Sequence, residues 1–293
     1  MLSIDKVRLA LHDQAAEFAG LELSSLPQIS GTDNDIYTLG SEFCVRLPKS
    51  PASAAQLLKE VTWLPRMQAL SLAAPQPLFL GDATPELKFG WAIYNWFEGK
   101  DLLRSAPLKQ HDIAIQIGDF LKGLWAVDPK HGPRSGAQNH YRGADLLKRD
   151  FLTHEAFRMV SDEFCHHSLI RVWENALSAS AFCGPPKWVH GDIHAANLIM
   201  DNGRIVAIID WGLMGVGDPA VDLLPAWNLL SSEAREGFKV MTGVDQATWN
   251  RGRGWALSVS VIAYSYYKGR QNFWLNDISK RVLSELITDA DSP

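Results

Sequence analysis

The spacing of hydrophobic residues divides the chain into a strand-rich part followed by a helix-rich part. Short apolar runs bounded by turn residues predict strands that close a small antiparallel sheet, at residues 31–40, 43–48, 75–80 and 90–97. From Leu108 onward the apolar positions recur at helical spacing. The pattern predicts a two-lobed α+β protein, with a first lobe of sheet and helix at residues 1–97 and a mostly helical second lobe at residues 98–293.

Two helices are predicted within the first lobe. One follows Ser3 or Asp5, either of which would cap it, and ends at Gly20. The other opens at Ser50, which a proline follows at the first helical position, and it ends at Pro65. The apolar side of this second helix is expected to consist of Leu57, Leu58, Val61 and Leu64.

A hairpin is predicted in the second lobe. Residues 198–200 and 205–209 are apolar runs, and the turn between them contains Asn202 and Gly203. Asn-Gly between such runs favours a type I′ turn, because both residues tolerate a positive φ. We therefore expect three cross-strand pairs, which are Met200 with Ile205, Leu198 with Ala207, and Asn197 with Ile208.

Two polar side chains would meet at the open end of this hairpin. Because side chains alternate faces along a strand, Asp210 shares a face with Ile208 and hence with Asn197. The two residues become diagonal neighbours roughly 7–8 Å apart. A divalent cation with oxygen ligands at about 2 Å fits between them, with phosphate oxygens and water as its other ligands. The alternative is an ordinary hairpin with polar ends.

The residues before the hairpin complete a recognisable spacing. Asp192 lies in the turn that precedes it, in the sequence His190-Gly191-Asp192, and is followed by Asn197 and by Asp210 in Ile-Asp-Trp. This arrangement resembles the catalytic loop and metal-binding segment of the protein-kinase fold, and more narrowly the aminoglycoside phosphotransferase family. The resemblance implies that Asp192 is the base for a substrate hydroxyl and that Asn197 and Asp210 bind Mg²⁺. Gly191 replaces the arginine of protein kinases, so an activation-loop phosphate has no partner here.

The same resemblance implies a nucleotide site in the first lobe. The loop containing Thr32 and Asn34 would cover the phosphates of ATP or GTP, although a plain hairpin turn explains it equally well. Arg46 lies in an apolar strand, where a charge is costly unless it is paired. It stands where kinases carry a lysine that bridges the phosphates to a helix glutamate, and Glu60 is the expected partner. An unpaired, exposed Glu60 is the alternative.

The end of the last strand is the expected adenine contact. In a kinase-like fold the chain crosses between lobes here, and backbone groups of Asn95, Trp96 and Phe97 would face the adenine. A plain strand end is an equally good explanation. Farther along, the stretch with Asp218 and Asp222 supports the catalytic loop in members of the family, and the resemblance therefore implies a structural role for both residues. Asp222 follows Asp210 by only twelve residues, too few for a peptide-binding segment, which favours a small acceptor.

Composition excludes several classes of partner. Hydrophobic residues make up 46% and charged residues 21% of the 293 positions, which is ordinary for a soluble globular protein. The formal net charge of −5 argues against nucleic acid as a partner. The three cysteines are widely spaced and fit a reduced cytosol. No signal peptide and no run near the ~18 apolar residues of a membrane span is present, so we expect a cytoplasmic protein without a membrane partner.

The sequence therefore predicts a phosphotransferase that moves the γ-phosphoryl group of ATP or GTP to a hydroxyl of a small molecule. The acceptor stays open between an antibiotic, such as an aminoglycoside or a macrolide, and a metabolite such as choline, homoserine or methylthioribose. One rival is a dinuclear metallophosphoesterase built on residues 191–194, but it needs histidine ligands near the C-terminus and no histidine follows His194. The other rival is a kinase-shaped binder without activity, which would usually lack one of the motif residues.

Overall fold

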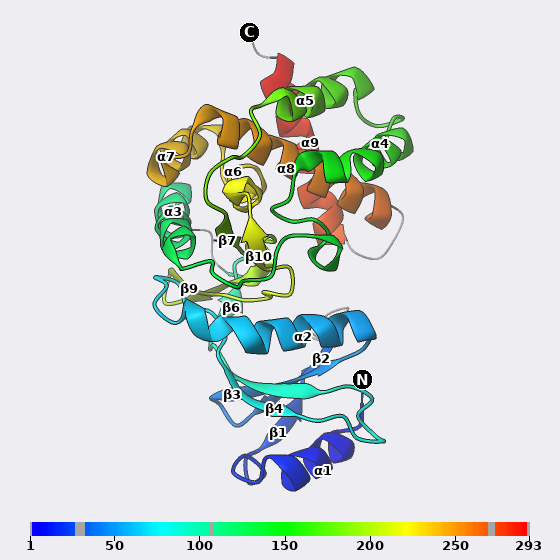
Figure 1. Ribbon diagram of the computed structural model, residues 1–293, viewed down its shortest axis with the longest axis vertical. Coiled ribbons are helices and arrows are strands. Elements are labelled where there is room, and N and C mark those ends of the chain that lie inside the picture. The colour runs from blue at the N-terminus through cyan, green and yellow to red at the C-terminus, as the bar shows by residue number, and fades with distance from the viewer. Residues whose placement is uncertain (1, 27–32, 106–107, 269–272, 292–293) are drawn as a thin grey trace. The chain divides into compact units, whose positions relative to one another are not determined.

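The computed structural model describes residues 2–26, 33–105, 108–268 and 273–291, which form two compact units (Figure 1). The first unit comprises Met1–Ser105 and Leu198–Gly212, and the second comprises Ala106–Asn197 and Leu213–Pro293. The first unit runs past residue 97 and takes in the hairpin that the sequence analysis assigned to the second lobe. It does so because strand β6, Lys100–Asp101, pairs with the first hairpin strand.

An antiparallel sheet forms the body of the first unit, as predicted. Its strand order is β1-β2-β3-β5-β4. A helix lies on each face of the sheet, α1 on one side and α2 on the other (Figure 1). Val45 faces the α1 side and is fully buried with Val7 and Tyr37, whereas the next residue, Arg46, points to the opposite side. The strands are β1 Leu23–Ser25, β2 Asn34–Leu39, β3 Phe43–Pro48, β4 Pro77–Gly81 and β5 Trp91–Asn95.

The first helix is shorter than predicted, and the second buries a different set of residues. Helix α1 spans Ile4–Gln14, and turns rather than helix continue to Gly20. Helix α2 spans Pro51–Trp63 and is followed by the 3₁₀ turn η1, Leu64–Met67. The side chains of Ser50 and Ser53 form a capping box at its start. Leu58 is 55% exposed, contrary to expectation, whereas the buried side of α2 consists of Ser53, Leu57 and Glu60.

The hairpin has the predicted turn but not the predicted register throughout. Its strands are β8, Leu198–Asp201, and β9, Arg204–Ile208, and both turn residues have positive φ, 46° at Asn202 and 76° at Gly203. Met200 pairs with Ile205 as expected. An irregularity after this pair places Val206 as an extra residue, so that Ile199 faces Ala207 and Leu198 faces Ile208.

The bulge overturns the argument that placed Asn197 and Asp210 on one strand face. The predicted pairs of Leu198 with Ala207 and of Asn197 with Ile208 are wrong, because one extra residue in β9 reverses the alternation beyond it. Asn197 does not belong to the strand at all. It ends the 3₁₀ turn η4, Ala195–Asn197. The prediction that Asn197 and Asp210 together bind a metal therefore rests on the sequence motif and stays a prediction.

The second unit is mostly helical, with α8 at its centre. Helix α8 packs against α4, α5, α9 and the 3₁₀ turn η5. A two-stranded ribbon of β7, Lys187–Val189, and β10, Gly215–Gly217, pairs Val189 with Gly215. The helices are α3 Gln110–Ala126, α4 Asp150–Met159, α5 His166–Ser178, α6 Pro225–Asn228, α7 Ser232–Thr242, α8 Gln246–Tyr267 and α9 Phe273–Asp291. The remaining 3₁₀ turns are η2 Ala137–Asn139, η3 Leu146–Arg149 and η5 Pro219–Leu223.

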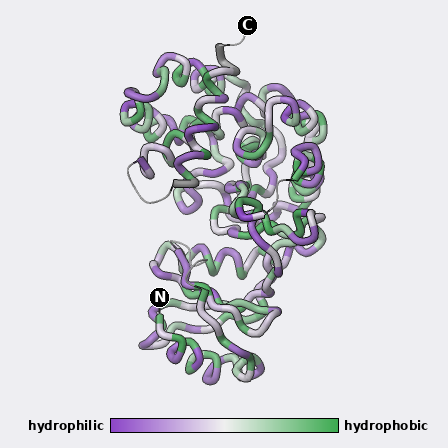
Figure 2. The backbone as a smooth tube through the Cα atoms, turned by 180° about the vertical axis from the view of Figure 1, so that it is seen from behind, coloured by the Kyte–Doolittle hydropathy of each residue, from purple (hydrophilic) through white to green (hydrophobic). Residues whose placement is uncertain are grey.

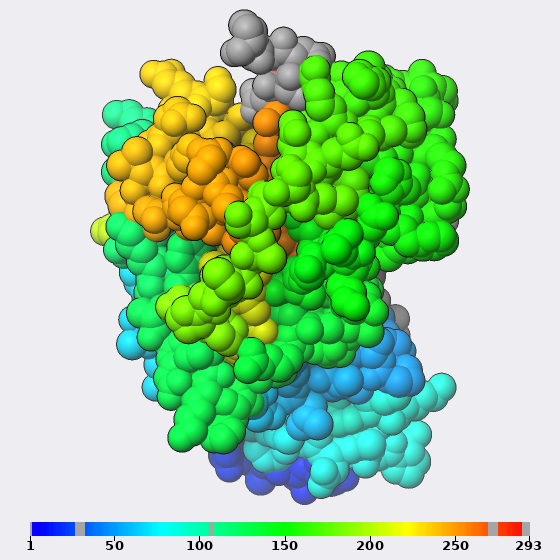
Figure 3. Space-filling model, turned by 45° about the horizontal axis from the view of Figure 1, so that its top comes forward, coloured from blue at the N-terminus to red at the C-terminus, as the bar shows by residue number. Residues whose placement is uncertain are grey.

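Hydrophobic residues are distributed as in a protein with internal cores. Hydrophobic and hydrophilic residues interleave along the backbone of both units (Figure 2). In the described ranges, no helix is long and apolar enough to cross a membrane. Helices α4 and α5, green in Figure 3, contribute to the surface of the second unit. Helix α4 carries the exposed hydrophobic side chains Phe151 and Met159 on this surface.

Candidate active site

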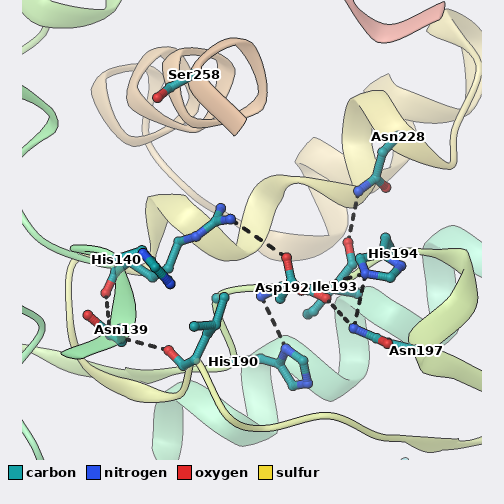
Figure 4. Close-up of polar contacts among 12 residues, drawn as sticks. Asn139, His140, His190, Asp192, Ile193, His194, Asn197, Asn228 and Ser258 are labelled. Atoms are coloured by element: carbon teal, nitrogen blue, oxygen red, sulfur yellow. Dashed lines mark hydrogen bonds and ion pairs between the residues drawn. The ribbon is translucent and has the colours of Figure 1, made fainter. Parts of the chain in front are cut away.

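The catalytic loop predicted from the sequence lies in the second unit, directly after β7 (Figure 4). Gly191 has a φ of +83°, a conformation that favours glycine and turns the chain sharply out of the strand. Asp192 follows with its side chain 25% exposed. Its backbone N–H donates to Nδ1 of the buried His190 at 3.2 Å. The loop therefore presents one partly accessible carboxylate on a backbone held by a neighbouring ring.

Asp222 also holds the catalytic loop, through two hydrogen bonds to its backbone. One carboxylate oxygen accepts from the backbone N–H of His190 at 3.0 Å, and the other accepts from that of Gly191 at 2.7 Å. Asp222 has no exposed surface. Burial raises the pKa of Asp222 to about 7, although the two backbone N–H groups act to lower it. The structural role expected for this residue is confirmed.

Asp218 anchors the segment that carries Asp222. It precedes η5 and accepts from the backbone N–H of Ala220 at 3.0 Å. The same carboxylate is paired with the buried Arg251 on α8, with an N–O distance of 2.7 Å. A helix cap and an ion pair on one side chain hold η5 against the central helix. The structural interpretation of Asp218 is thus confirmed as well.

Cationic and imidazole groups surround the Asp192 carboxylate. Nε2 of His194 lies 3.5 Å from one oxygen, and Nη2 of Arg142 lies 3.7 Å from the other. Burial on its own raises the pKa of Asp192, but His194, Arg142 and His190 outweigh it and hold the pKa below its usual range. Asp192 is therefore ionised at neutral pH. Such a group can orient a hydroxyl and receive its proton late in phosphoryl transfer.

Asn197 is tied to Asp192 in a way that leaves one of its atoms available. Its Nδ2 donates to the carbonyl oxygen of Asp192 at 3.0 Å and contacts Nε2 of His194 at 3.2 Å (Figure 4). In the described part of the chain, no group donates to Oδ1. An amide oxygen is a hard ligand of the kind Mg²⁺ prefers. The donor set thus fits the predicted metal role of Asn197.

The first unit contains the ion pair expected between Arg46 and Glu60. Nη1 of Arg46 lies 2.5 Å from Oε2 of Glu60, which also accepts from the Tyr94 hydroxyl at 3.3 Å. Glu60 has no exposed surface, and no described residue donates to its second oxygen. Burial raises the pKa of Glu60 although Arg46 opposes this change. The expected pairing is confirmed, and an exposed, unpaired Glu60 is ruled out.

Asp210 belongs to the same electrostatic group. It is exposed, follows β9 and has a φ of 65°, which is uncommon for a residue with a Cβ. Its negative charge raises the pKa values of both Arg46 and Glu60. The fold therefore brings Arg46 and Asp210, which lie far apart in the sequence, into one charged group of the first unit. A cation bound by Asp210 would be near an arginine suited to phosphate oxygens.

The structure gives less information on the other residues predicted to contact the nucleotide. Thr32 lies outside the described residues. Asn34 begins β2, and its Oδ1 is buried without a partner among the described residues. The backbone N–H of Asn95 donates to Gln76 and that of Trp96 donates to Glu42, so neither serves as a donor to adenine. The adenine role stays a prediction that now rests on their carbonyl groups and on Phe97.

One residue of this site was missed by the sequence analysis. Arg142 comes from the segment 130–143, in which the sequence analysis singled out no residue. No periodicity or motif marks it, because its contact with Asp192 depends on how that loop folds. The described residues contain no cluster of three or more His, Cys, Asp or Glu side chains suited to a metal ion. The metallophosphoesterase alternative would need such a cluster.

The sheet with its Arg46–Glu60 pair and the helical unit with its Asp192 loop define a kinase-like phosphotransferase fold. The chain belongs to the phosphotransferase enzyme family, whose model matches residues 25–255. Aminoglycoside 3′-phosphotransferase of Escherichia coli is 23% identical over 175 residues, which are 55% of this chain and 61% of that protein. The homologous protein of Salmonella typhimurium matches equally. The match thus spans less than two thirds of these relatives.

Solved structures show the same fold over almost the whole chain. The GDP and kanamycin complex of APH(2″)-IIIa has a TM-score of 0.72 at 16% identity, over 97% of this chain and 99% of that one. The apoenzyme of macrolide 2′-phosphotransferase MphH from Brachybacterium faecium has a TM-score of 0.61 at 20% identity, over 95% and 98%. At this level of identity the likeness establishes the fold class, which agrees with the prediction from the sequence.

Proposed function

We propose that this chain transfers the γ-phosphoryl group of ATP or GTP to a hydroxyl group of a small molecule. The observation that carries the proposal is the construction of the catalytic loop. Asp192 is an ionised, partly accessible carboxylate whose backbone is held by His190 and Asn197, while Asp222 holds the residues before it. Phosphoryl transfer needs a positioned hydroxyl and charge neutralisation more than covalent chemistry. A rigid loop with one accessible carboxylate meets the first need.

The remaining roles are those that the likeness to kinase-fold phosphotransferases implies, and the chemistry of the residues supports them. Asp192 orients the acceptor hydroxyl and receives its proton. Arg46, kept charged beside Glu60, binds phosphate oxygens, and the loop with Thr32 and Asn34 covers them. Asn197 and Asp210 hold Mg²⁺, which, when bound, neutralises charge on the phosphates. Asn95, Trp96 and Phe97 contact the base of the nucleotide through their backbone.

The acceptor is a small hydroxylated compound. Relatives and structural neighbours are named as aminoglycoside or macrolide phosphotransferases, which favours an antibiotic acceptor. Neighbouring structures contain GDP or ATP, so both nucleotides are tested as donors. A metabolite with a hydroxyl group, such as choline, homoserine or methylthioribose, is the alternative acceptor. Both cases use the same residues and differ only in the acceptor pocket.

A nucleotide-consumption screen tests this function. The purified protein is incubated with ATP or GTP, with and without Mg²⁺, against a panel of aminoglycosides, macrolides and hydroxylated metabolites. We expect Mg²⁺-dependent consumption that requires an acceptor and is lost in Asp192→Asn. Mass spectrometry of the acceptor should show one added phosphoryl group. Consumption that is equal in Asp192→Asn, or no magnesium-dependent nucleotide binding by calorimetry, would contradict the proposal.

A further inference from the structure

A buried arginine lies beside the carboxylate proposed to act on the acceptor. Arg142 is 8% exposed, and its Nη2 lies 3.7 Å from Oδ1 of Asp192. Its Nε and Nη1 are buried and have no hydrogen-bond partner among the described residues. The guanidinium also lies 6.0 Å from the centre of the Trp255 ring. A charge without its full set of hydrogen bonds is costly to bury, so this position calls for an explanation other than stability.

The loop that delivers Arg142 is held in an uncommon conformation. His140 and Tyr141 both have positive φ, 53° and 61°, which few residues with a Cβ adopt. The fully buried Asn139 fixes the turn, since its Nδ2 donates to the carbonyl oxygen of Arg142 at 3.0 Å and to that of Leu213 at 3.2 Å. Strained backbone of this kind persists only where surrounding contacts determine it, and it is frequent at functional sites.

Gly191 makes room for this arginine. A Cβ placed on Gly191 would lie 3.0 Å from the Cβ of Arg142 and 3.1 Å from the carbonyl oxygen of Leu213. A side chain at position 191, where protein kinases carry an arginine, would therefore crowd the side chain of Arg142 and the carbonyl oxygen of Leu213. The close approach of Arg142 to the catalytic loop thus favours a residue without a side chain at position 191.

Asp192 and Arg142 are surrounded by different charged groups. Asp192 faces Arg142, His190 and His194, whereas Arg142 faces the two carboxylates of Asp192 and Asp222. Arg149, the other buried arginine nearby, donates to the carbonyl oxygen of His140 and to Ser258 rather than to Asp192. Arg142 is thus the arginine whose charge acts directly on the Asp192 carboxylate.

We infer that Arg142 is a positioning residue for phosphoryl transfer, which holds the Asp192 carboxylate in one orientation by charge from the side opposite His194. The inference rests on the proposed function of Asp192. In protein kinases the arginine of the catalytic loop precedes the aspartate directly. Here Gly191 stands directly before Asp192, and the arginine beside Asp192 comes from a separate loop. The guanidinium touches no reacting atom and acts only through Asp192.

Kinetics of Arg142→Met and Arg142→Lys test the positioning role. For whichever transfer reaction the screen detects, nucleotide hydrolysis included, we expect Arg142→Met to lower kcat about 10- to 100-fold, the usual effect of misplacing a reacting group. The KM values for nucleotide and acceptor should stay within about twofold, because no ligand contact is removed. Arg142→Lys keeps a charge and should recover part of the loss. An unchanged kcat in a folded Arg142→Met would overturn the inference.

Arg235→Met is the matched control. Arg235 is also a buried arginine of the second unit that pairs with a carboxylate and lies over a tryptophan ring, but its partners are Glu285 and Trp227. It should lose stability with little change in kcat. If Arg235→Met lowers kcat as much as Arg142→Met does, loss of a buried arginine alone explains the effect, and the assignment fails.

Urea unfolding tests the Arg142–Asp192 contact without any activity. Asp192→Asn should lower the unfolding midpoint when Arg142 is present, because it leaves the buried guanidinium without its facing carboxylate. In the Arg142→Met background the same change should have little effect. Equal effects in both backgrounds overturn the inference. If Arg142→Met does not fold, Asp192→Asn is compared with the wild type alone. An Asp192→Asn variant that is as stable as the wild type would then overturn the inference. If the wild-type protein transfers no phosphoryl group, the proposed function fails, whereas this measurement still decides the contact.

Discussion

Replacing Arg46 by methionine would leave Glu60 as a buried carboxyl without its counter-ion. Glu60 has no exposed surface, and Arg46 is its ion-pair partner at 2.5 Å. Among the residues that the structure describes, only the Tyr94 hydroxyl would still donate to it, at 3.3 Å. Removing one member of such a pair typically costs about 3–5 kcal/mol, because the other charge remains desolvated. Glu60 can become neutral by taking up a proton. The loss of stability in Arg46→Met is then limited to the free energy of that protonation.

The cost of that proton depends on pH. Starting from the ordinary pKa of 4.5, protonating Glu60 at pH 7 costs about 3.4 kcal/mol, which is 2.5 pH units at 1.36 kcal/mol each. At pH 5 the same step costs about 0.7 kcal/mol. A carboxyl whose folded pKa lies above its unfolded value contributes stability that is present below about 4.5 and is lost as pH rises. Arg46→Met should therefore be least stable, relative to the wild type, near neutral pH.

Urea unfolding at pH 5 and pH 7 measures this difference. The free-energy gap between the wild type and Arg46→Met should widen by at most about 2.7 kcal/mol between the two pH values. The double variant Arg46→Met/Glu60→Gln carries no ionisable group at either position and should show no such widening. A gap that is the same at pH 5 and pH 7 would refute the reasoning. Calorimetry with ATP or GTP should show weaker nucleotide binding by Arg46→Met if this arginine binds phosphate.

Three further predictions concern the proposed reaction and the stability of the catalytic loop. Asp192→Asn should lose roughly two or more orders of magnitude in turnover with nucleotide affinity nearly intact, whereas Asp210→Asn should also weaken magnesium-dependent nucleotide binding; equal weakening by both would contradict the division of roles. Asp222→Ala should leave the N–H groups of His190 and Gly191 unpaired and cost about 2–6 kcal/mol in urea unfolding, at about 1–3 kcal/mol each. Burial raises the pKa of Asp222 to about 7, so its contribution to stability should be lost as pH rises from about 4 to 7, and Asp222→Asn should remove that dependence.

Local patterns were sufficient to predict much of the first unit. The strand Phe43–Pro48 has the predicted ends, and the type I′ turn at Asn202 and Gly203 forms because its backbone preference is local. That Arg46 needs a partner was predictable because a charge in an apolar strand is costly, and the resemblance to kinases implied that Glu60 is this partner. Periodicity alone missed that Glu60 belongs to the buried side of its helix, where a pattern of apolar residues gives no sign of a buried acid.

Features that depend on long-range packing were not predictable. The extra residue in β9, Val206, changes the register without any Gly or Pro to mark it. Arg142 reaches Asp192 through a loop whose conformation depends on Asn139 and on the absence of a side chain at Gly191. Each of these follows from contacts between segments far apart in the sequence. Reading the residues in order therefore identified the carboxylate of the catalytic loop but not the arginine beside it.

The tryptophan that follows Asp210 limits how far this segment can move. Trp211 is fully buried, and its indole N–H donates to the carbonyl oxygen of Ile208 at 2.8 Å. In protein kinases the phenylalanine at this place moves between active and inactive packing. Taking an indole of roughly 150–250 Å² into water costs about 4–6 kcal/mol. A conformation with the Trp211 indole in water should therefore be populated by roughly one molecule in a thousand to one in twenty thousand. Nearly all molecules should therefore hold the backbone around Asp210 in a single conformation, so this segment is not expected to work as a two-state switch.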